Sequence, residues 1–287
     1  MMTRFAALAM IAGCVVVAQS PVPSSTQTPT PAPAQTSAPA PAPAKKRLLA
    51  IGAVAGFQHD ATTDALATIW KIGKDTGLWD TYIRTDTQLI TKKKLGSNAK
   101  NLDYFDAVLF YTTGELPMDD EQKASLLAFV HEDGKGFIGV HSAIDTFYKW
   151  PEYGEMVGAY FDDHPWGVFQ APVIVEDPDF PAMRAFPHEF TIDDEIYQPK
   201  EFSRERVRVL ARLDETKIDL QNPRVKRKDG DFAVAWAREY GNGRVFYSTF
   251  GHNPAVLTRP DVQAMYREAV KWAMGMVKGD ATPRPRP

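Results

Sequence analysis

The sequence predicts an α/β protein built on a doubly wound parallel sheet, with further β-strands added in its C-terminal half. Two observations support this fold class. Between residues 48 and 140, short apolar runs alternate with segments of helical periodicity, which is typical of a parallel sheet covered by helices. After residue 165, strand candidates follow one another with little helix between them.

The first half of the domain contains four predicted strands, at residues 48–54, 81–84, 106–112 and 136–140. The run 106–112 (DAVLFYT) is apolar on both faces, as central strands of a parallel sheet are. Residues 64–73 have helical spacing. Asp119 and Asp120 can cap a second helix, which ends before Gly134.

The second half contains five predicted strands, at residues 173–176, 190–197, 207–213, 232–236 and 244–249. Gly241-Asn242-Gly243 lies between the last two and predicts a hairpin turn. An amphipathic helix over 262–276 closes the domain. One domain with an extended or mixed sheet fits this order best.

The N-terminus has the features of an export signal. Arg4 precedes an apolar run that ends at Ala18 and is too short to span a bilayer permanently, so residues 1–18 are a predicted signal peptide cut before Gln19. The alternative is a lipoprotein signal with a lipid on Cys14, which would be the only attachment to a membrane. Both alternatives predict a periplasmic or secreted protein.

Three further segments follow the predicted signal peptide. Residues 19–46 are a Pro/Ala/Thr-rich stretch, predicted to be a disordered linker because it cannot bury apolar surface. Residues 47–278 form the predicted folded domain. Residues 279–287 are again proline-rich and are predicted to be a disordered tail.

Charge and cysteine content exclude several classes of function. The formal net charge is -3, so nothing in the composition indicates a nucleic-acid partner. Cys14 is the only cysteine, so the predicted domain has no disulfide, thiolate nucleophile or cysteine metal ligand. A metal ion would therefore need His, Asp or Glu ligands. We expect no nucleotide cofactor.

Three of the six histidines directly follow predicted strands: His59, His141 and His252. Ligands of open parallel sheets bind beyond the carboxyl ends of the strands, so these side chains are expected at a functional edge. A single histidine near a strand end is more often structural, but the three together favour a functional site. His141 lies in Gly139-Val140-His141-Ser142-Ala143, which has the form of a strand-to-helix elbow.

Glu195, at the end of a predicted strand, is the best carboxylate candidate to complete the site. The resulting set of His59, His141, His252 and Glu195 has the chemistry to hold a divalent metal ion. Such an ion would polarise a sugar oxygen or activate water. Without an ion, the same four residues would be general acid and base candidates.

Five further residues are candidates for substrate binding: Asp60, Glu115, His164, Trp166 and Tyr197. For each of them a structural role is the alternative. His164 either orients a substrate or fixes a loop, and Trp166 either stacks on a sugar or packs against the domain. Glu115 either binds a ligand or begins the turn into the next helix.

Several segments together resemble the ThuA-like family, which is associated with trehalose utilisation. The matching segments are residues 56–59, 110–114, 136–143, 160–166, 194–197 and 243–252. The resemblance covers nearly all of residues 47–277 and implies a glutamine-amidotransferase-like, flavodoxin-like fold without the amidotransferase cysteine. It also implies sugar catabolism, including routes through 3-keto-glycosides, and a divalent metal in some members. Asp163 departs from the usual glycine before the His-Pro pair.

These observations give three hypotheses. The first is an exported enzyme that hydrolyses a glycoside or cleaves it by elimination, with 3-keto-glycosides as one substrate class, and that is not an amidotransferase. The second is a non-catalytic carbohydrate-binding or scaffold module. The third is a metallohydrolase of an ester or amide. Metal content and turnover of glycosides distinguish them.

Overall fold

The computed structural model describes residues 12–20, 44–97 and 99–286, and the chain divides into two units, Met1–Pro43 and Ala44–Pro287. Residues 12–20 have no regular secondary structure. Residues 1–11 of the predicted signal peptide and residues 21–43 of the predicted linker lie outside the described residues. Among the described residues, no helix is both long and apolar enough to cross a membrane.

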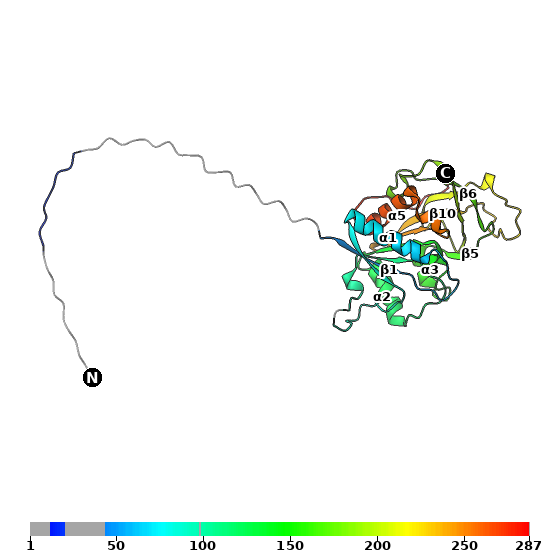
Figure 1. The fold of residues 1–287 in the computed structure, drawn as a ribbon, viewed down its shortest axis with the longest axis horizontal. Coiled ribbons are helices and arrows are strands. Elements are labelled where there is room, and N and C mark those ends of the chain that lie inside the picture. Colours follow the sequence, from blue (N-terminus) through cyan, green and yellow to red (C-terminus); the bar gives the residue numbers. More distant parts are fainter. Residues whose placement is uncertain (1–11, 21–43, 98, 287) are drawn as a thin grey trace. The chain divides into compact units, whose positions relative to one another are not determined.

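A nine-stranded sheet forms the centre of the domain, in the order β2-β1-β3-β4-β11-β10-β9-β6-β7 (Figure 1). Its first five strands are β2 (Trp79–Arg84), β1 (Lys46–Ile51), β3 (Ala107–Phe110), β4 (Gly136–Val140) and β11 (Gly243–Ser248). All four pairings among them are parallel. In chain order this is the 2-1-3-4-5 arrangement of flavodoxin-like folds, which confirms the predicted doubly wound sheet.

The four remaining strands of the sheet are antiparallel and confirm the predicted extension. They are β10 (Ala233–Tyr240), β9 (Arg208–Leu213), β6 (Val168–Val175) and β7 (Glu189–Glu195). The predicted hairpin joins β10 to β11, with Tyr240 paired to Gly243. Gly241 in this turn has φ +58°, a conformation that glycine adopts without strain.

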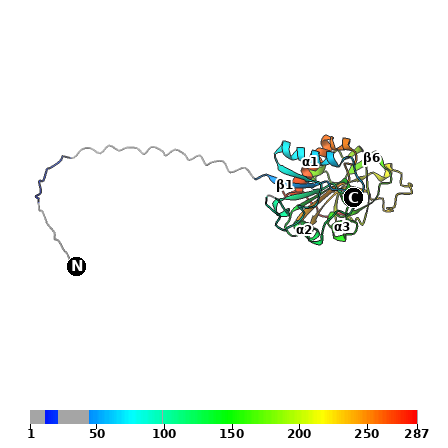
Figure 2. The same ribbon diagram turned by 60° about the horizontal axis from the view of Figure 1, so that its bottom comes forward.

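Helices cover both faces of the sheet, as Figure 2 shows. One face carries α1 (Thr62–Thr76), α4 (Pro254–Leu257) and α5 (Pro260–Ala273), and the other carries α2 (Asp120–His131) and α3 (Pro151–Val157). The strands alternate accordingly: Leu48 and Ala50 of β1 pack in the core under α1 and α5, and Leu49 and Ile51 pack in the core under α2 and α3.

Some short elements have no counterpart in the sequence prediction. They are α3, a two-stranded sheet of β5 (Tyr160–Asp163) and β8 (Gln198–Lys200), and the 3₁₀ turns Leu102–Tyr104, His141–Ile144, Pro181–Met183 and Glu215–Lys217. The predicted linker also reached one residue too far, because Lys46 belongs to β1.

The C-terminal tail differs from the prediction of disorder. Residues 279–286 lie against the domain: Trp272 Nε1 donates a hydrogen bond to the Gly279 carbonyl at 3.1 Å, and Ala281 is 3% exposed. Arg284 donates to the carbonyl of Glu176. A proline-rich composition disfavours helices and central strands, but it does not prevent a segment from packing in an irregular conformation.

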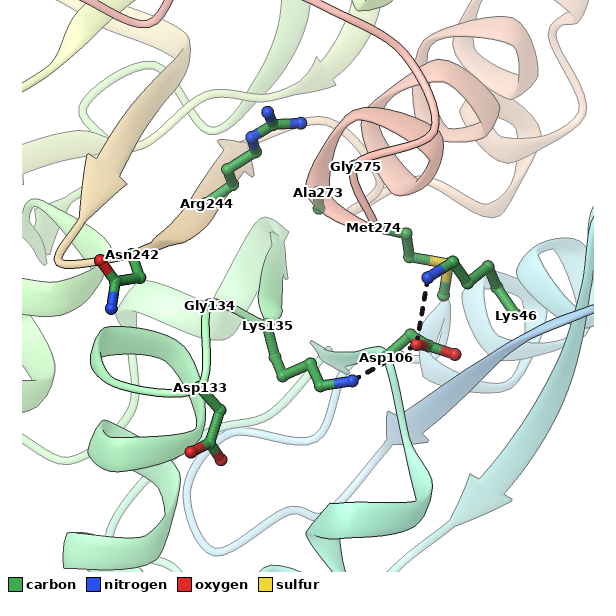
Figure 3. A pocket seen from close by; sticks show the side chains of 10 residues that line it. All are labelled: Lys46, Asp106, Asp133, Gly134, Lys135, Asn242, Arg244, Ala273, Met274 and Gly275. Atoms are coloured by element: carbon green, nitrogen blue, oxygen red, sulfur yellow. Dashed lines mark hydrogen bonds and ion pairs between the residues drawn. The ribbon is translucent and has the colours of Figure 1, made fainter.

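The amino ends of the parallel strands are closed by ion pairs around a cavity of about 260 Å³ (Figure 3). Lys46 Nζ and Lys135 Nζ lie 3.3 and 3.4 Å from the Asp106 carboxylate, which also accepts a hydrogen bond from Arg47 N. Burial favours a raised pKa at Asp106, but the hydrogen bond and the two lysines hold its pKa below the ordinary value. The two lysines therefore share one internal carboxylate.

Asp119 provides a test of how the sequence defines α2. Its side chain accepts a hydrogen bond from Gln122 N, and the Gln122 side-chain oxygen accepts one from Asp119 N, which completes a capping box. We expect Asp119→Ala to lower the free energy of unfolding by about 1 kcal/mol, measured by urea denaturation. The neighbouring Asp120→Ala is the control and should have a smaller effect; an equal loss in both variants would contradict the capping role.

Candidate functional site

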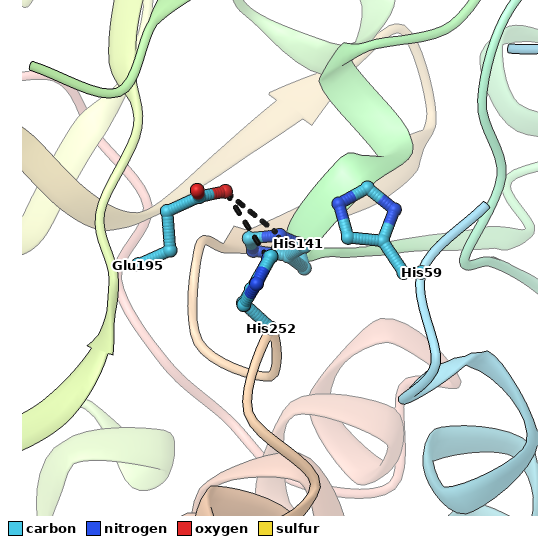
Figure 4. A group of neighbouring side chains, drawn as sticks. All are labelled: His59, His141, Glu195 and His252. Atoms are coloured by element: carbon cyan, nitrogen blue, oxygen red, sulfur yellow. Dashed lines mark hydrogen bonds and ion pairs between the residues drawn. The ribbon is translucent and has the colours of Figure 1, made fainter. Parts of the chain in front are cut away.

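Four side chains from distant parts of the sequence converge at the carboxyl ends of the parallel strands (Figure 4). His59 lies in the loop after β1, His141 directly follows β4, Glu195 ends β7, and His252 follows β11. Each residue offers one potential ligand atom, and these atoms all lie within 4.8 Å of one another. The structure therefore brings together the four residues that the sequence singled out.

His141 is oriented by the main chain of a neighbouring strand end. Its Nδ1 lies 2.6 Å from the carbonyl oxygen of Thr249, so Nδ1–H donates and Nε2 carries the free lone pair. The side chain is fully buried, and the backbone has φ +44°, which is unusual for a residue with a side chain. This elbow conformation fixes where the imidazole points.

Three donor atoms lie close to the separations that ligands of one metal ion adopt. His252 Nδ1 is 3.3 Å from His141 Nε2 and 3.2 Å from Glu195 Oε2, and this oxygen is 3.7 Å from His141 Nε2. Ligands bound at about 2.1 Å with tetrahedral or octahedral angles are separated by about 3.0–3.4 Å. Both distances from His252 Nδ1 lie in this range, and the distance from His141 Nε2 to Glu195 Oε2 is longer than it, so the three atoms could share one cation.

His59 completes the group and has an unsatisfied nitrogen. Its Nε2 lies 3.2 Å from the hydroxyl of Tyr197, while its Nδ1 is buried without a hydrogen-bond partner among the described residues. The ring lies 4.8 Å from that of His141 and 5.2 Å from that of His252, between centroids. A buried polar atom without a partner is costly unless a ligand binds near it.

The electrostatics favour neutral imidazoles at two of the three histidines. Burial, then the neighbouring His252, lowers the pKa of His59 to about 4. Burial, then the neighbouring His59, lowers the pKa of His141 well below its ordinary value. The hydrogen bond to Glu195 raises the pKa of His252. Neutral imidazole is the form that binds metals, so two of the ligands are already in the required state.

Asp194 has a positioning role that the sequence analysis did not assign. Its two carboxylate oxygens accept hydrogen bonds from Gly251 N at 2.7 Å and Asn253 N at 2.8 Å, the residues on either side of His252. Burial raises the pKa of Asp194 to about 6, against the lowering effect of these bonds. Its sequence signal is an acidic residue between Ile192 and Ile196 on the buried side of a strand.

His164 lies at the edge of the group. Its Nδ1 is 3.1 Å from Glu195 Oε1, an ion-pair contact without hydrogen-bond geometry, and its side chain is 35% exposed. Asp163, which departs from the family pattern, accepts a hydrogen bond from His164 N and pairs with Arg224. The departure thus supplies a side chain that fixes this loop.

The other substrate-binding candidates lie in different environments. Asp60 is exposed and lines a cavity next to the histidines, and Tyr197 is buried against His141. Trp166 donates its indole N–H to the carbonyl of Asp219 and packs on core aromatic rings. Glu115 accepts a hydrogen bond from Lys149 N and is not one of the four grouped residues.

Comparison with known proteins agrees with this architecture. Residues 47–273 match the model of the ThuA family, described as trehalose utilisation. The chain belongs to the ThuA family. No curated protein matches it.

Solved structures of ThuA-like proteins have the same fold. One from Bacteroides uniformis superposes with a TM-score of 0.65 and 21% identity, covering 82% of this chain and 95% of the other. One from Parabacteroides merdae gives 0.63 and 16%, covering 84% and 98%. A cytoplasmic protein of Salmonella typhimurium gives 0.51 and 12%, covering 79% and 98%. At these identities the likeness shows the fold alone.

The lowered pKa of His59 predicts acid sensitivity of the metal-free protein. The unfolded chain takes up a proton at this histidine near pH 6.5, whereas the folded chain does so only near pH 4, so stability falls as the pH drops between these values. From about pH 7 to about pH 5, we expect His59 to contribute a loss of about 2 kcal/mol, which His59→Gln removes while the share from His141 remains. Urea denaturation at both pH values measures it.

The exposed His131 is the matched control, since His131→Gln should leave the pH dependence of unfolding unchanged. An equal acid sensitivity in wild type and His59→Gln would show that the buried neutral imidazole of His59 is not its cause.

Proposed function

We propose that this ThuA-family protein is a metal-dependent enzyme that cleaves a glycoside by hydrolysis or elimination, with 3-keto-glycosides as one substrate class. The observation that carries the proposal is the spacing of the donor atoms of His141, His252 and Glu195, at 3.2–3.7 Å from one another. The family's association with trehalose utilisation supports a sugar as the substrate.

The four grouped residues would hold the ion: His59, His141, His252 and Glu195. A divalent ion at this position would polarise a sugar oxygen or lower the pKa of a bound water. The fit of the site rests on its own chemistry, because two neutral imidazoles and a carboxylate are ligands of ions such as Zn²⁺ and Mn²⁺.

In this proposal, Glu195 or a histidine is the base that removes a proton from the substrate. Glu195 contacts His164 through Oε1, and it contacts His141 and His252 through Oε2. The carboxylate can therefore interact with His164 and with the two grouped histidines at the same time. A ketone at C3 of the sugar makes the C2 proton acidic. In the elimination route, the base removes this proton, an enolate forms, the C1–O bond breaks, and the departing oxygen of the aglycone takes up a proton.

Tyr197 supplies a hydrogen-bond donor rather than a base. Burial raises the pKa of its phenol well above the ordinary value, as does the negative charge of Glu195, so the hydroxyl keeps its proton. This hydroxyl lies 3.2 Å from His59 Nε2, inside the group of four residues. In this proposal, it would donate to a substrate oxygen that gains charge during the reaction.

Metal content and turnover test the proposal together. We expect purified protein to bind Zn²⁺ or Mn²⁺ with about one ion per chain in calorimetry, and to cleave trehalose or 3-keto-trehalose. His141→Ala removes a buried ligand and should lower both metal affinity and turnover by about 100-fold or more. Glu195→Gln should lower both as well.

The controls separate the site from the fold. His131→Ala, at an exposed position, should leave metal affinity and turnover unchanged, and circular dichroism should show that each variant is folded. Metal-free protein that binds a sugar and leaves every glycoside intact would replace this proposal with a non-catalytic binding module. Turnover that survives in His141→Ala would remove the central residue of the mechanism.

We also propose that the protein acts outside the cytoplasm. The support is the predicted signal in residues 1–18. Mass spectrometry of the mature protein from a bacterial host should find either an N-terminus at Gln19 or a lipid on Cys14. An intact Met1 on the mature protein would contradict export.

A further inference from the structure

The two most exposed large hydrophobic side chains of the domain lie in one cavity beside the histidines. Within residues 44–97 and 99–286, Phe57 is 65% exposed and Val168 is 50% exposed, the two highest fractions for large hydrophobic side chains. A cavity of about 320 Å³ is lined by Phe57, Gln58, His59, Asp60, Val168, His252, Asn253 and Pro254. Exposed apolar side chains that share a cavity indicate a ligand more strongly than scattered ones do.

The exposure of Phe57 does not result from a loosely held loop. Ala55 N donates to the carbonyl of Thr113 at 2.9 Å, and Thr113 Oγ1 donates to the carbonyl of Phe57 at 2.8 Å. The ring also meets the imidazole of His59 edge-on, with centroids 4.9 Å apart. The phenyl ring is therefore held in place against one of the four grouped residues before any ligand binds.

Val168 is linked to the site through the sheet register. It is the first residue of β6, and it pairs directly with Glu195, the last residue of β7. Side chains of directly opposed residues on antiparallel strands lie on the same face of the sheet. The Val168 side chain therefore stands beside that of Glu195, at the edge of the same group.

The cavity offers polar groups next to this apolar wall. Gln58 and Asp60 are both exposed, and neither side chain makes a hydrogen bond or ion pair with another described residue. The Asn253 side chain, in contrast, caps α4 by accepting a hydrogen bond from Ala255 N. A ligand that matches this lining has one apolar face and hydroxyl groups around its edge, as a sugar ring does.

We propose that Phe57 and Val168 form the apolar wall of a sugar-binding subsite, in which the C–H face of a sugar ring packs against the phenyl ring of Phe57. The hydroxyls of that sugar bind Gln58 and Asp60. This inference rests on the proposed function, because it assigns the substrate contacts of the same site. It makes Phe57 a determinant of sugar affinity and gives it no part in metal binding.

Calorimetry with three probes tests the subsite: trehalose, methyl α-glucopyranoside and the open-chain polyol sorbitol. Sorbitol carries hydroxyls but has no rigid C–H face, so the full-length wild type should bind the two ring sugars and not sorbitol. Phe57→Ala should weaken binding of the ring sugars by about tenfold or more. Phe57→Trp keeps an aromatic face and should remain within about threefold of wild type.

Two controls distinguish this inference from the proposed function. Trp70→Ala removes an aromatic ring that is 42% exposed on α1 and does not line the cavity, and it should leave sugar binding unchanged. Metal affinity, measured separately, should be the same in wild type and in all Phe57 variants. Sugar affinity in Phe57→Ala within twofold of wild type, or no binding of either ring sugar by wild type, would overturn the subsite. A wild-type protein that binds no metal ion would instead refute the metal-dependent function.

Discussion

The buried carboxylate of Asp194 connects the two halves of the fold. β7 is the last strand of the sheet, four positions from β11, yet Asp194 accepts hydrogen bonds from the amides on either side of His252, directly after β11. The antiparallel extension must therefore curl back over the carboxyl ends of the parallel strands. The same bending of the sheet brings the next residue, Glu195, into contact with His252. Asp194 stays buried at a cost in desolvation, which the two backbone hydrogen bonds offset only in part.

The parallel half of the sheet supplies the other two histidines by topology alone. His59 follows β1 and His141 follows β4, and the carboxyl ends of parallel strands meet at one edge. In the order β2-β1-β3-β4-β11, the strand order switches sides between β1 and β3, and residues 54–58 in the loop after β1 are exposed. That loop carries His59 together with the exposed Phe57, which places one of the four grouped side chains next to an exposed aromatic ring.

The sequence predicts the contribution of the parallel strands to this site better than that of the antiparallel extension. The parallel strands were predictable because their apolar runs are continuous, and the histidines after them had to share an edge. The curl of the added strands depends on long-range pairing, so neither the role of Asp194 nor the placement of Val168 beside Glu195 follows from periodicity. The docked tail was missed because its contacts use side chains and carbonyls rather than regular structure.

Several features of the site lower the stability of the folded protein. The positive φ of His141, the buried Nδ1 of His59 without a partner among the described residues, and two imidazoles held neutral by burial each cost free energy. A purely structural cluster would be expected to replace them with apolar side chains, as the neighbouring core does. The donor atoms of His141, His252 and Glu195 lie 3.2–3.7 Å from one another. Ligand binding therefore explains this geometry better than folding does. In the proposed metal site, this strain would hold the four side chains in place before an ion binds.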